Sequence, residues 1–257
     1  MILPHLTHPS FQFDKIKYGY FTRAGGVSDN SFASLNCGPG SGDLLDNVHE
    51  NHRRIAAEFN LDSSNLLFCK QIHSDKVVTA TTPWQRHLRP EADAMVTKEK
   101  GIALAVMSAD CVPILFYDST NHIIGAAHSG WKGAIGGIIE ATINAMEQIG
   151  GSAKTIHACI GPCIRQDSYE VSDEFYDTFV QEAAANKVLF KPSVRDGHVM
   201  FDLAGYVRGR LIMRGIEHVS DIGADTQSDE AHFFSYRRRT LRDELQNGIQ
   251  MSVIALC

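Results

Sequence analysis

Residues 102–133 decide the fold of this chain, and they read IALAVMSADCVPILFYDSTNHIIGAAHSGWKG. Three apolar runs lie within this stretch, and their length and their branched and aromatic content predict buried strands. The first run leads into a polar loop that holds Cys111, and the last run delivers His128. The three runs are residues 102–107, 114–117 and 123–127. Layered folds collect their functional sites at such strand ends.

Helical patterns flank these strands on both sides. Apolar residues at three- and four-residue spacing predict an amphipathic helix over 44–59. The same spacing predicts a long helix over 135–149, which a glycine pair ends. Ser172 and Asp202 are expected to be the N-caps of two further helices.

Shorter extended segments complete the pattern, and one of them, 66–70, delivers Gln71 and His73 at its end. The other expected strands are an aromatic one that opens residues 19–28, and residues 155–160, 233–236 and 251–256. Strands and helices mix without strict alternation, which predicts α/β or α+β packing around a mixed sheet. No repeat or linker interrupts residues 1–257, so we expect a single compact layered domain.

Composition and charge exclude several classes of protein. The chain has 257 residues, 44% of them hydrophobic, and carries 24 Lys and Arg against 30 Asp and Glu, a net charge of −6. This balance disfavours a nucleic acid or an anionic membrane as partner, because both require a basic face. The N-terminal residues lack a secretory pattern and no apolar run is long enough for a bilayer span, so we expect a cytoplasmic protein. Its six scattered cysteines are then expected to be reduced.

Three predicted strands each end close to a residue that could bind a metal or act as a nucleophile: His73, Cys111 and His128. Two imidazoles and a thiolate suit Zn²⁺, and three protein ligands leave a fourth position for water or substrate, as in catalytic zinc sites. A metal-free alternative makes Cys111 a nucleophile and His128 its base. The plainest alternative is that His128 caps a helix and Cys111 is merely buried. Asp110 could orient an imidazole, accept a proton, or serve only as a turn residue.

A dense basic cluster, residues 237–242, stands out in this acidic chain. Arg237 and Arg238 directly follow an aromatic segment, so one of them could reach inward to a phosphate. Arg239 and Arg242 are expected to be solvated surface residues. Trp131, flanked by small residues, is either core filler or a stacking surface for a planar ligand.

Eight motifs of the chain resemble those of a known group, the laccase-domain family. This family was long labelled multicopper polyphenol oxidase and has since been reinterpreted as purine nucleoside phosphorylases. The resemblance runs from about residue 18 to 256. Its motifs are GYFTRAGGVS at 19–28, SLN at 34–36, QIH at 71–73, ADCVPI at 109–114, AHSGWKG at 127–133, IGP at 160–162, YEV at 169–171 and FFSYRR at 233–238.

The resemblance implies a single α/β domain, similar to the catalytic domain of cytotoxic necrotizing factors, with one zinc held by His73, Cys111 and His128. It also implies a glycosyl transferase that phosphorolyses adenosine, inosine, guanosine and methylthioadenosine, together with adenosine deaminase activity. Its partners would be the nucleoside and phosphate, and the protein a monomer or small homo-oligomer. Copper in the same site would be adventitious and would explain weak phenol oxidation. Two alternatives remain, a peptidoglycan-editing hydrolase and a Cys/His amidohydrolase.

Further roles follow from the resemblance. Gln71 could contact substrate or orient an imidazole, and Asn36, in a glycine-rich loop, could hydrogen-bond the ribose. The chain departs from the family where Asn-Arg is replaced by Asn51-His52 and Gly-Arg by Gly248-Ile249. If the second arginine holds an anion elsewhere in the family, Arg237, Arg238 or Arg242 must replace it here.

Overall fold

Strands β6 (Ala103–Ser108), β7 (Val112–Asp118) and β8 (Ile123–Ser129) occupy the three apolar runs, which confirms their prediction. The structure is a computed structural model and describes residues 2–257. The strands do not share one sheet: β6 belongs to a five-stranded sheet, whereas β7 and β8 are central in a six-stranded sheet. The chain therefore crosses from one sheet to the other within the loop that holds Cys111.

The five-stranded sheet has the order β1-β2-β14-β6-β3. Its central strand β14 pairs antiparallel with both β2 and β6, and β3 joins β6 in parallel. The strands other than β6 are β1 (His5–Leu6), β2 (Ile16–Phe21), β3 (Leu66–Leu67) and β14 (Gln250–Leu256). The predicted strand over 66–70 is thus shorter than expected, and the predicted C-terminal strand is confirmed.

The six-stranded sheet has the order β13-β9-β7-β8-β5-β4. Its four central strands pair antiparallel, and each edge strand pairs in parallel with its neighbour. Its other strands are β4 (Val77–Thr79), β5 (Ala94–Thr97), β9 (Ile156–Ile160) and β13 (His218–Asp221). The extended segment expected at 155–160 is β9.

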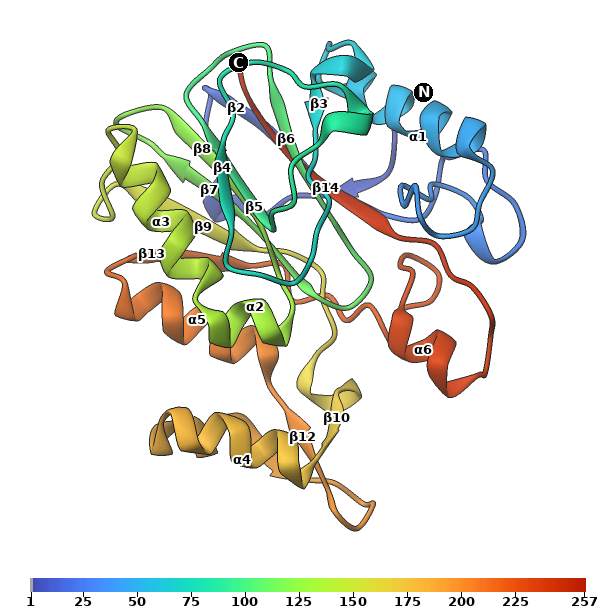
Figure 1. Ribbon diagram of the computed structural model, residues 1–257, viewed down its shortest axis with the longest axis vertical. Coiled ribbons are helices and arrows are strands. Elements are labelled where there is room, and N and C mark those ends of the chain that lie inside the picture. Colours follow the sequence, from blue (N-terminus) through green and yellow to red (C-terminus); the bar gives the residue numbers. More distant parts are fainter. Residues whose placement is uncertain (1) are drawn as a thin grey trace.

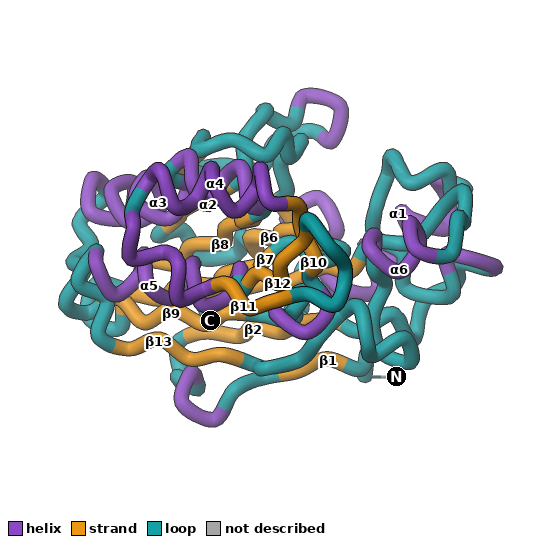
Figure 2. The backbone as a smooth tube through the Cα atoms, turned by 90° about the horizontal axis from the view of Figure 1, so that it is seen from below, coloured by secondary structure: helices purple, strands orange, loops and turns teal. Residues whose placement is uncertain are grey.

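The two sheets pack face to face around a shared apolar layer, to which β6 contributes Leu104 and Val106 and β7 contributes Leu115 and Tyr117. A second core lies between the six-stranded sheet and helices α3 and α5, and a third between the five-stranded sheet and α1. Figure 1 shows these helices on either side of the strands, and Figure 2 shows α3 and α5 gathered at one end and α1 and α6 at the other. The result is the mixed α/β packing that the sequence predicted.

Three helices follow the sequence closely. Helix α1 (Leu45–Glu58) matches the predicted 44–59. Ser172 caps α4 (Asp173–Glu182) by accepting from Phe175 N, and Asp202 caps α5 (Leu203–Met213) by accepting from Gly205 N. The long helix expected at 135–149 is instead two helices, α2 (Trp131–Gly136) and α3 (Ile138–Gln148), because Gly137 adopts a φ of +100° between them.

The strand expected at 233–236 is absent from the described residues, and this prediction is wrong. Ser235 Oγ accepts a hydrogen bond from Arg238 N, so the segment caps α6 (Tyr236–Leu241) instead of extending. The basic residues that follow Tyr236 therefore lie on a helix.

A small three-stranded sheet and α4 form a segment that projects from the body of the molecule (Figure 1). Its strands are β10 (Glu170–Ser172), β11 (Phe190–Pro192) and β12 (His198–Phe201). The remaining helices are 3₁₀ turns at Pro9–Phe11, Asn30–Phe32, Ser63–Asn65, Arg86–Leu88, Gln166–Ser168 and Ala184–Leu189. Among residues 2–257, no helix is both long and apolar enough to cross a bilayer.

Candidate metal centre and its cleft

The structure brings His73, Cys111 and His128 together. One ligand atom of each lies within 4.8 Å of the others. Cys111 Sγ is 3.8 Å from His73 Nε2, and the two imidazole rings are nearly perpendicular, with centroids 4.8 Å apart. Residues that are far apart in sequence thus form one compact group of nitrogen and sulfur donors.

Each of these residues is placed by a different part of the fold. His128 lies near the end of β8, opposite Pro113 of β7. Cys111 lies in the crossing between the two sheets, and His73 lies in the loop after β3 with a φ of +59°. Gly130 leaves the space they occupy, because a Cβ atom there would lie 2.8 Å from His73 Cδ2 and 2.9 Å from Cys111 Sγ.

Asp93, just before β5, holds two of these residues in place. Its Oδ1 atom lies 3.0 Å from His128 Nδ1 and accepts the backbone N–H of His73 at 3.0 Å. Its Oδ2 atom accepts from the backbone and hydroxyl of Ser74, at 2.6 and 2.8 Å. Asp93 is not among the site residues predicted from the sequence, although a carboxylate between two alanines at the start of an apolar run is a usable signal of a buried, partnered acid.

The electrostatics of the group favour a thiolate. Burial raises the pKa of Cys111, but the two neighbouring histidines lower it by more, so the pKa falls below its ordinary value to about 6. Burial lowers the pKa of His128, whereas Cys111 and Asp93 raise it to about 9. Burial also raises the pKa of Asp93, and hydrogen bonds from His128 and Ser74 bring it down to about 2. The thiolate form is the one that binds metals and acts as a nucleophile.

This donor set fits a zinc ion. Asp93 occupies Nδ1 of His128, which leaves Nε2 as the free ring nitrogen, and a carboxylate that bonds the far nitrogen is the usual support of a metal-binding histidine. A cysteine and two histidines are common zinc ligands, and three of them leave one position open. The same line of residues, Asp93, His128 and Cys111, also has the order of a base-activated thiol.

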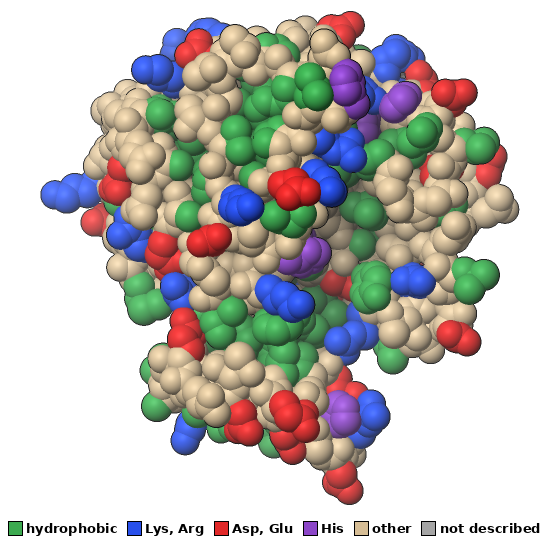
Figure 3. Space-filling view, in the orientation of Figure 1, with side chains coloured by type: hydrophobic (Ala, Val, Ile, Leu, Met, Phe, Trp, Pro, Cys, Tyr) green, Lys and Arg blue, Asp and Glu red, His purple; other side chains and the backbone are tan. Residues whose placement is uncertain are grey.

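The three residues lie in a cleft of about 950 Å³. Its walls include the aromatic residues Trp131 and Tyr169 and the basic residues Arg89, Lys132 and Arg237. Figure 3 shows apolar side chains gathered at the narrowing between the body of the molecule and the projecting α4 segment. A planar, polar ligand could enter a cleft with this mixture of aromatic and cationic walls.

The structure separates the two arginines proposed for phosphate. Arg237 lines the cleft, its guanidinium carbon 5.2 Å from the centroid of the Tyr169 ring, and its Nη1 donates to Glu170 O at 2.6 Å. Arg238 is buried, and its guanidinium donates to the carbonyls of Thr226, Gln227 and Phe233. Arg238 therefore stabilises the loop before α6. Arg242 pairs with Glu230 at the surface, as expected for a solvated residue.

Asp110 is one of the residues that line the cleft, although it is largely buried, and its φ is +95°. Its carboxylate accepts from Thr226 Oγ1 at 2.7 Å, Ser235 Oγ at 3.0 Å and Arg237 N at 2.6 Å. Burial raises its pKa above the ordinary value despite these donors. Asp110 thus anchors the start of α6, and the contact with an imidazole is made by Asp93 instead.

Gln71 and Asn36 both brace loops. The Gln71 amide donates to Met107 O at 2.7 Å and accepts from Met107 N at 2.8 Å, which ties the loop that holds His73 to the end of β6. Asn36 is fully buried, and its amide donates to Ser41 and Asp43 and accepts from the backbone of Gly38 and Ile249. These contacts commit the Asn36 amide to the shape of the glycine-rich loop.

The two departures from the family pattern differ in their surroundings. His52 is buried, and its Nε2 lies 2.8 Å from Cys37 O. Ile249 lines the cleft and packs against Gly38, where a Cβ atom would lie 2.8 Å from Ile249 Cδ1. The cleft wall at Ile249 is therefore apolar, and its positive charge comes from elsewhere.

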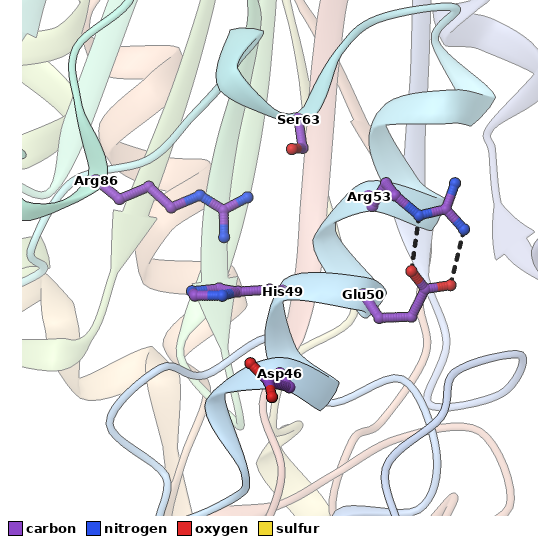
Figure 4. A pocket seen from close by; sticks show the side chains of 6 residues that line it. All are labelled: Asp46, His49, Glu50, Arg53, Ser63 and Arg86. Atoms are coloured by element: carbon purple, nitrogen blue, oxygen red, sulfur yellow. Dashed lines mark hydrogen bonds and ion pairs between the residues drawn. The ribbon is translucent and has the colours of Figure 1, made fainter.

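A second, smaller hollow of about 440 Å³ lies on the surface at α1. Figure 4 shows that it is lined by both acids and bases, and that Arg53 and Glu50 point toward one another. Arg53 Nε lies 2.7 Å from Glu50 Oε2 in this ion pair. It shares no lining residue with the cleft. The complete lining is Asp46, His49, Glu50, Arg53, Ser63 and Arg86.

Comparison with known proteins agrees with this fold and shows the family of the chain. A Rickettsia conorii protein named purine nucleoside phosphorylase is 37% identical over 209 residues, which cover 81% of this chain and 85% of that protein. A Deinococcus radiodurans protein of the same name is 37% identical over 257 residues, which cover 99% of this chain and 93% of that protein. The crystal structure of a Neisseria meningitidis protein superposes with a TM-score of 0.84 at 33% identity over 95% of each chain. The family model described as multi-copper polyphenol oxidoreductase laccase matches residues 17–257, and the chain therefore belongs to that family.

Proposed function

We propose that this protein is a zinc-dependent purine nucleoside phosphorylase that accepts adenosine, inosine, guanosine and methylthioadenosine, and that it also deaminates adenosine. The observation that carries the proposal is the convergence of His73, Cys111 and His128 inside a cleft with aromatic and cationic walls. Relatives named purine nucleoside phosphorylase, at about 37% identity over most of the chain, support it.

Zinc is the metal we assign to the three ligands. Bound there, it would act as a Lewis acid and could lower the pKa of a water molecule. An oxidase with several copper centres requires further histidine clusters, and His73, Cys111 and His128 are the one group of this kind among residues 2–257. Copper outcompetes zinc for nitrogen and sulfur donors, so adventitious copper could replace zinc in this site.

The residues of the cleft can divide the work of phosphorolysis. A phosphate oxygen forms a bond to the ribose C1′ while the bond from C1′ to the purine breaks, and a proton goes to the departing base. We assign the phosphate to Arg237, because its guanidinium lies on the cleft wall and a planar guanidinium suits phosphate oxygens. Trp131 and Tyr169 offer apolar faces to the purine.

Asp110 supports this arrangement by accepting the backbone N–H of Arg237, which fixes the start of α6 beside the cleft. Its carboxylate already accepts three hydrogen bonds, which leaves about one of its four acceptor sites for a proton in deamination. We therefore assign it first to positioning Arg237, and keep proton transfer as the role that a deaminase assay would test.

Turnover of inosine with and without phosphate tests the proposal. We expect hypoxanthine and ribose 1-phosphate from purified protein only when phosphate is present, and inosine from adenosine in a parallel assay. Cys111→Ala should abolish both reactions and lose bound metal. Cys69→Ala is the matched control, because Cys69 also lines the cleft but burial raises its pKa to about 12, so it stays a thiol. Phosphate-independent release of hypoxanthine would contradict a phosphorylase.

A second candidate, an amidohydrolase that uses Cys111 as nucleophile, is favoured by the line of Asp93, His128 and Cys111. In this reaction the thiolate attacks an amide carbonyl, and the C–N bond breaks as His128 protonates the leaving amine. Water then hydrolyses the resulting thioester, which releases the carboxylic acid and restores Cys111. Its expected likeness to the cytotoxic necrotizing factor catalytic domain stays a prediction. Metal-free protein that releases an amine from an amide substrate, with no phosphorolysis of inosine, would favour this candidate.

A further inference from the structure

Two buried hydroxyl groups lack a hydrogen-bond partner among the described residues: Ser108 Oγ and Ser129 Oγ. Ser108 is 4% exposed and Ser129 is 0% exposed. Buried polar atoms in proteins nearly always have a partner, so each unpaired hydroxyl requires an explanation.

Their surroundings differ. Ser108 lines the cleft that holds the candidate metal ligands, whereas Ser129 does not. Ser108 is the last residue of β6 and lies on the same face of the strand as Leu104 and Val106, which pack in the layer between the two sheets. The Ser108 side chain therefore closes that layer at the point where it meets the cleft.

The polar neighbours of Ser108 are already paired with other groups. Gln250 of β14 is paired with Ser108 in the sheet. Its side-chain amide accepts from Phe234 N at 2.9 Å and donates to Phe234 O at 3.2 Å. Gln71 uses both ends of its amide on Met107, and Asp110 accepts three hydrogen bonds. The Ser108 hydroxyl is thus left free at the cleft by a surrounding network that is otherwise complete.

We propose that Ser108 Oγ is a substrate-binding group that hydrogen-bonds a neutral polar atom of the nucleoside. This inference rests on the proposed function and adds a binding contact to it. A hydroxyl both donates and accepts but carries no charge, so it suits a ribose hydroxyl or an edge atom of the purine. The phosphate is better served by the charged Arg237.

Ser108→Ala and Ser129→Ala form a matched pair, since each removes one unpaired, buried hydroxyl. We expect Ser108→Ala to raise the KM for inosine about tenfold, which corresponds to about 1.4 kcal/mol, with bound metal and melting temperature unchanged. Ser129→Ala should leave all three quantities as in the wild type. A KM that does not change in Ser108→Ala, or that rises equally in both variants, would overturn the proposal, as would loss of metal from Ser108→Ala.

Substrate analogues identify the atom that Ser108 contacts. 2′-Deoxyinosine and 5′-deoxyinosine each lack one ribose hydroxyl, and purine riboside lacks the oxygen on the base. For the analogue that lacks the partner atom, the KM values of the wild type and of Ser108→Ala should be equal. If the wild type binds inosine without phosphate-dependent turnover, the proposed function fails, while the ratio of the two inosine Kd values still tests the Ser108 contact. If the wild type binds no nucleoside, both proposals fail.

Discussion

The Oδ1 atom of Asp93 lies 3.0 Å from Nδ1 of His128, and neither side chain is more than 3% exposed. The same carboxylate accepts backbone N–H groups from Ile72, His73 and Ser74. One buried acid therefore fixes the ring of one candidate ligand and the backbone of another.

Asp93→Asn should weaken metal binding by about 10- to 100-fold, because partners of this kind orient a ligating histidine and raise its basicity. Equilibrium titration with zinc, followed by competition with a chelator, measures the change. Glu91→Gln is the control, since Glu91 is an exposed carboxylate two residues away that pairs with Lys70. Equal zinc affinity in Asp93→Asn and the wild type would show that His128 needs no such support.

Gly130→Ala should disrupt the metal centre while leaving the rest of the fold in place. Its new Cβ atom would lie within 3 Å of both His73 Cδ2 and Cys111 Sγ, so one ligand has to move. Gly136→Ala is the control, because a Cβ atom there meets nothing within 4 Å. The zinc content of the two purified variants is the measurement, and full metal loading of Gly130→Ala would contradict the geometry described here.

Alanine variants of Arg237 and Arg238 should separate function from stability. Arg237→Ala is expected to raise the KM for phosphate by at least tenfold and to keep much of the deamination of adenosine, because deamination uses no phosphate. Arg238→Ala should lower the free energy of unfolding by about 2–4 kcal/mol, because three backbone carbonyls lose a buried charged donor. Phosphate kinetics and urea unfolding of both variants test this division, and a wild-type phosphate KM in Arg237→Ala would remove Arg237 from the anion site.

The ion pair of Asp221 with Arg165 should make stability depend on pH. Burial raises the pKa of Asp221, but hydrogen bonds from Arg165 lower it below its ordinary value. A carboxyl group with a depressed pKa in the folded state stabilises the protein at pH values above its unfolded pKa, about 3.9. This contribution is lost as pH falls through the folded pKa.

Asp221→Asn should therefore reduce the free energy of unfolding by about 1 kcal/mol at pH 7 and by less at pH 3. Urea unfolding at the two pH values gives the comparison, with the exposed Asp196→Asn as control. If the loss in free energy of unfolding caused by Asp221→Asn were larger at pH 3 than at pH 7, the ion pair would not act as described.

The strand ends that carry the ligands could be predicted because their signal is local. Apolar runs bounded by polar loops mark β6 and β8, and Ser172 and Asp202 mark helix caps that the structure confirms. The strand predicted at 233–236 failed since aromatic residues favour strands, whereas the Ser235 cap starts a helix there.

Contacts across the fold left no such local signal. Asp93 directly precedes β5 and contacts His128 on the neighbouring strand β8. Arg238 is buried although its basic sequence neighbours are typical of a solvated surface. Asn36 and Gln71 have the residue types of substrate contacts, but backbone groups brought near by folding occupy their amides. Burial and pairing of this kind depend on how segments that are distant in the sequence pack together, so no local sequence pattern predicts them.

The crossing of the chain between its two sheets would give a metal ion at this site a mechanical role as well as a chemical one. His73 follows a strand of the five-stranded sheet, His128 ends a strand of the six-stranded sheet, and Cys111 lies on the connection. An ion bound by all three acts as a cross-link at one end of the interface between the sheets. Sliding of one sheet over the other would pull the three side chains apart, so an ion bound there would couple the two sheets and resist their separation during unfolding.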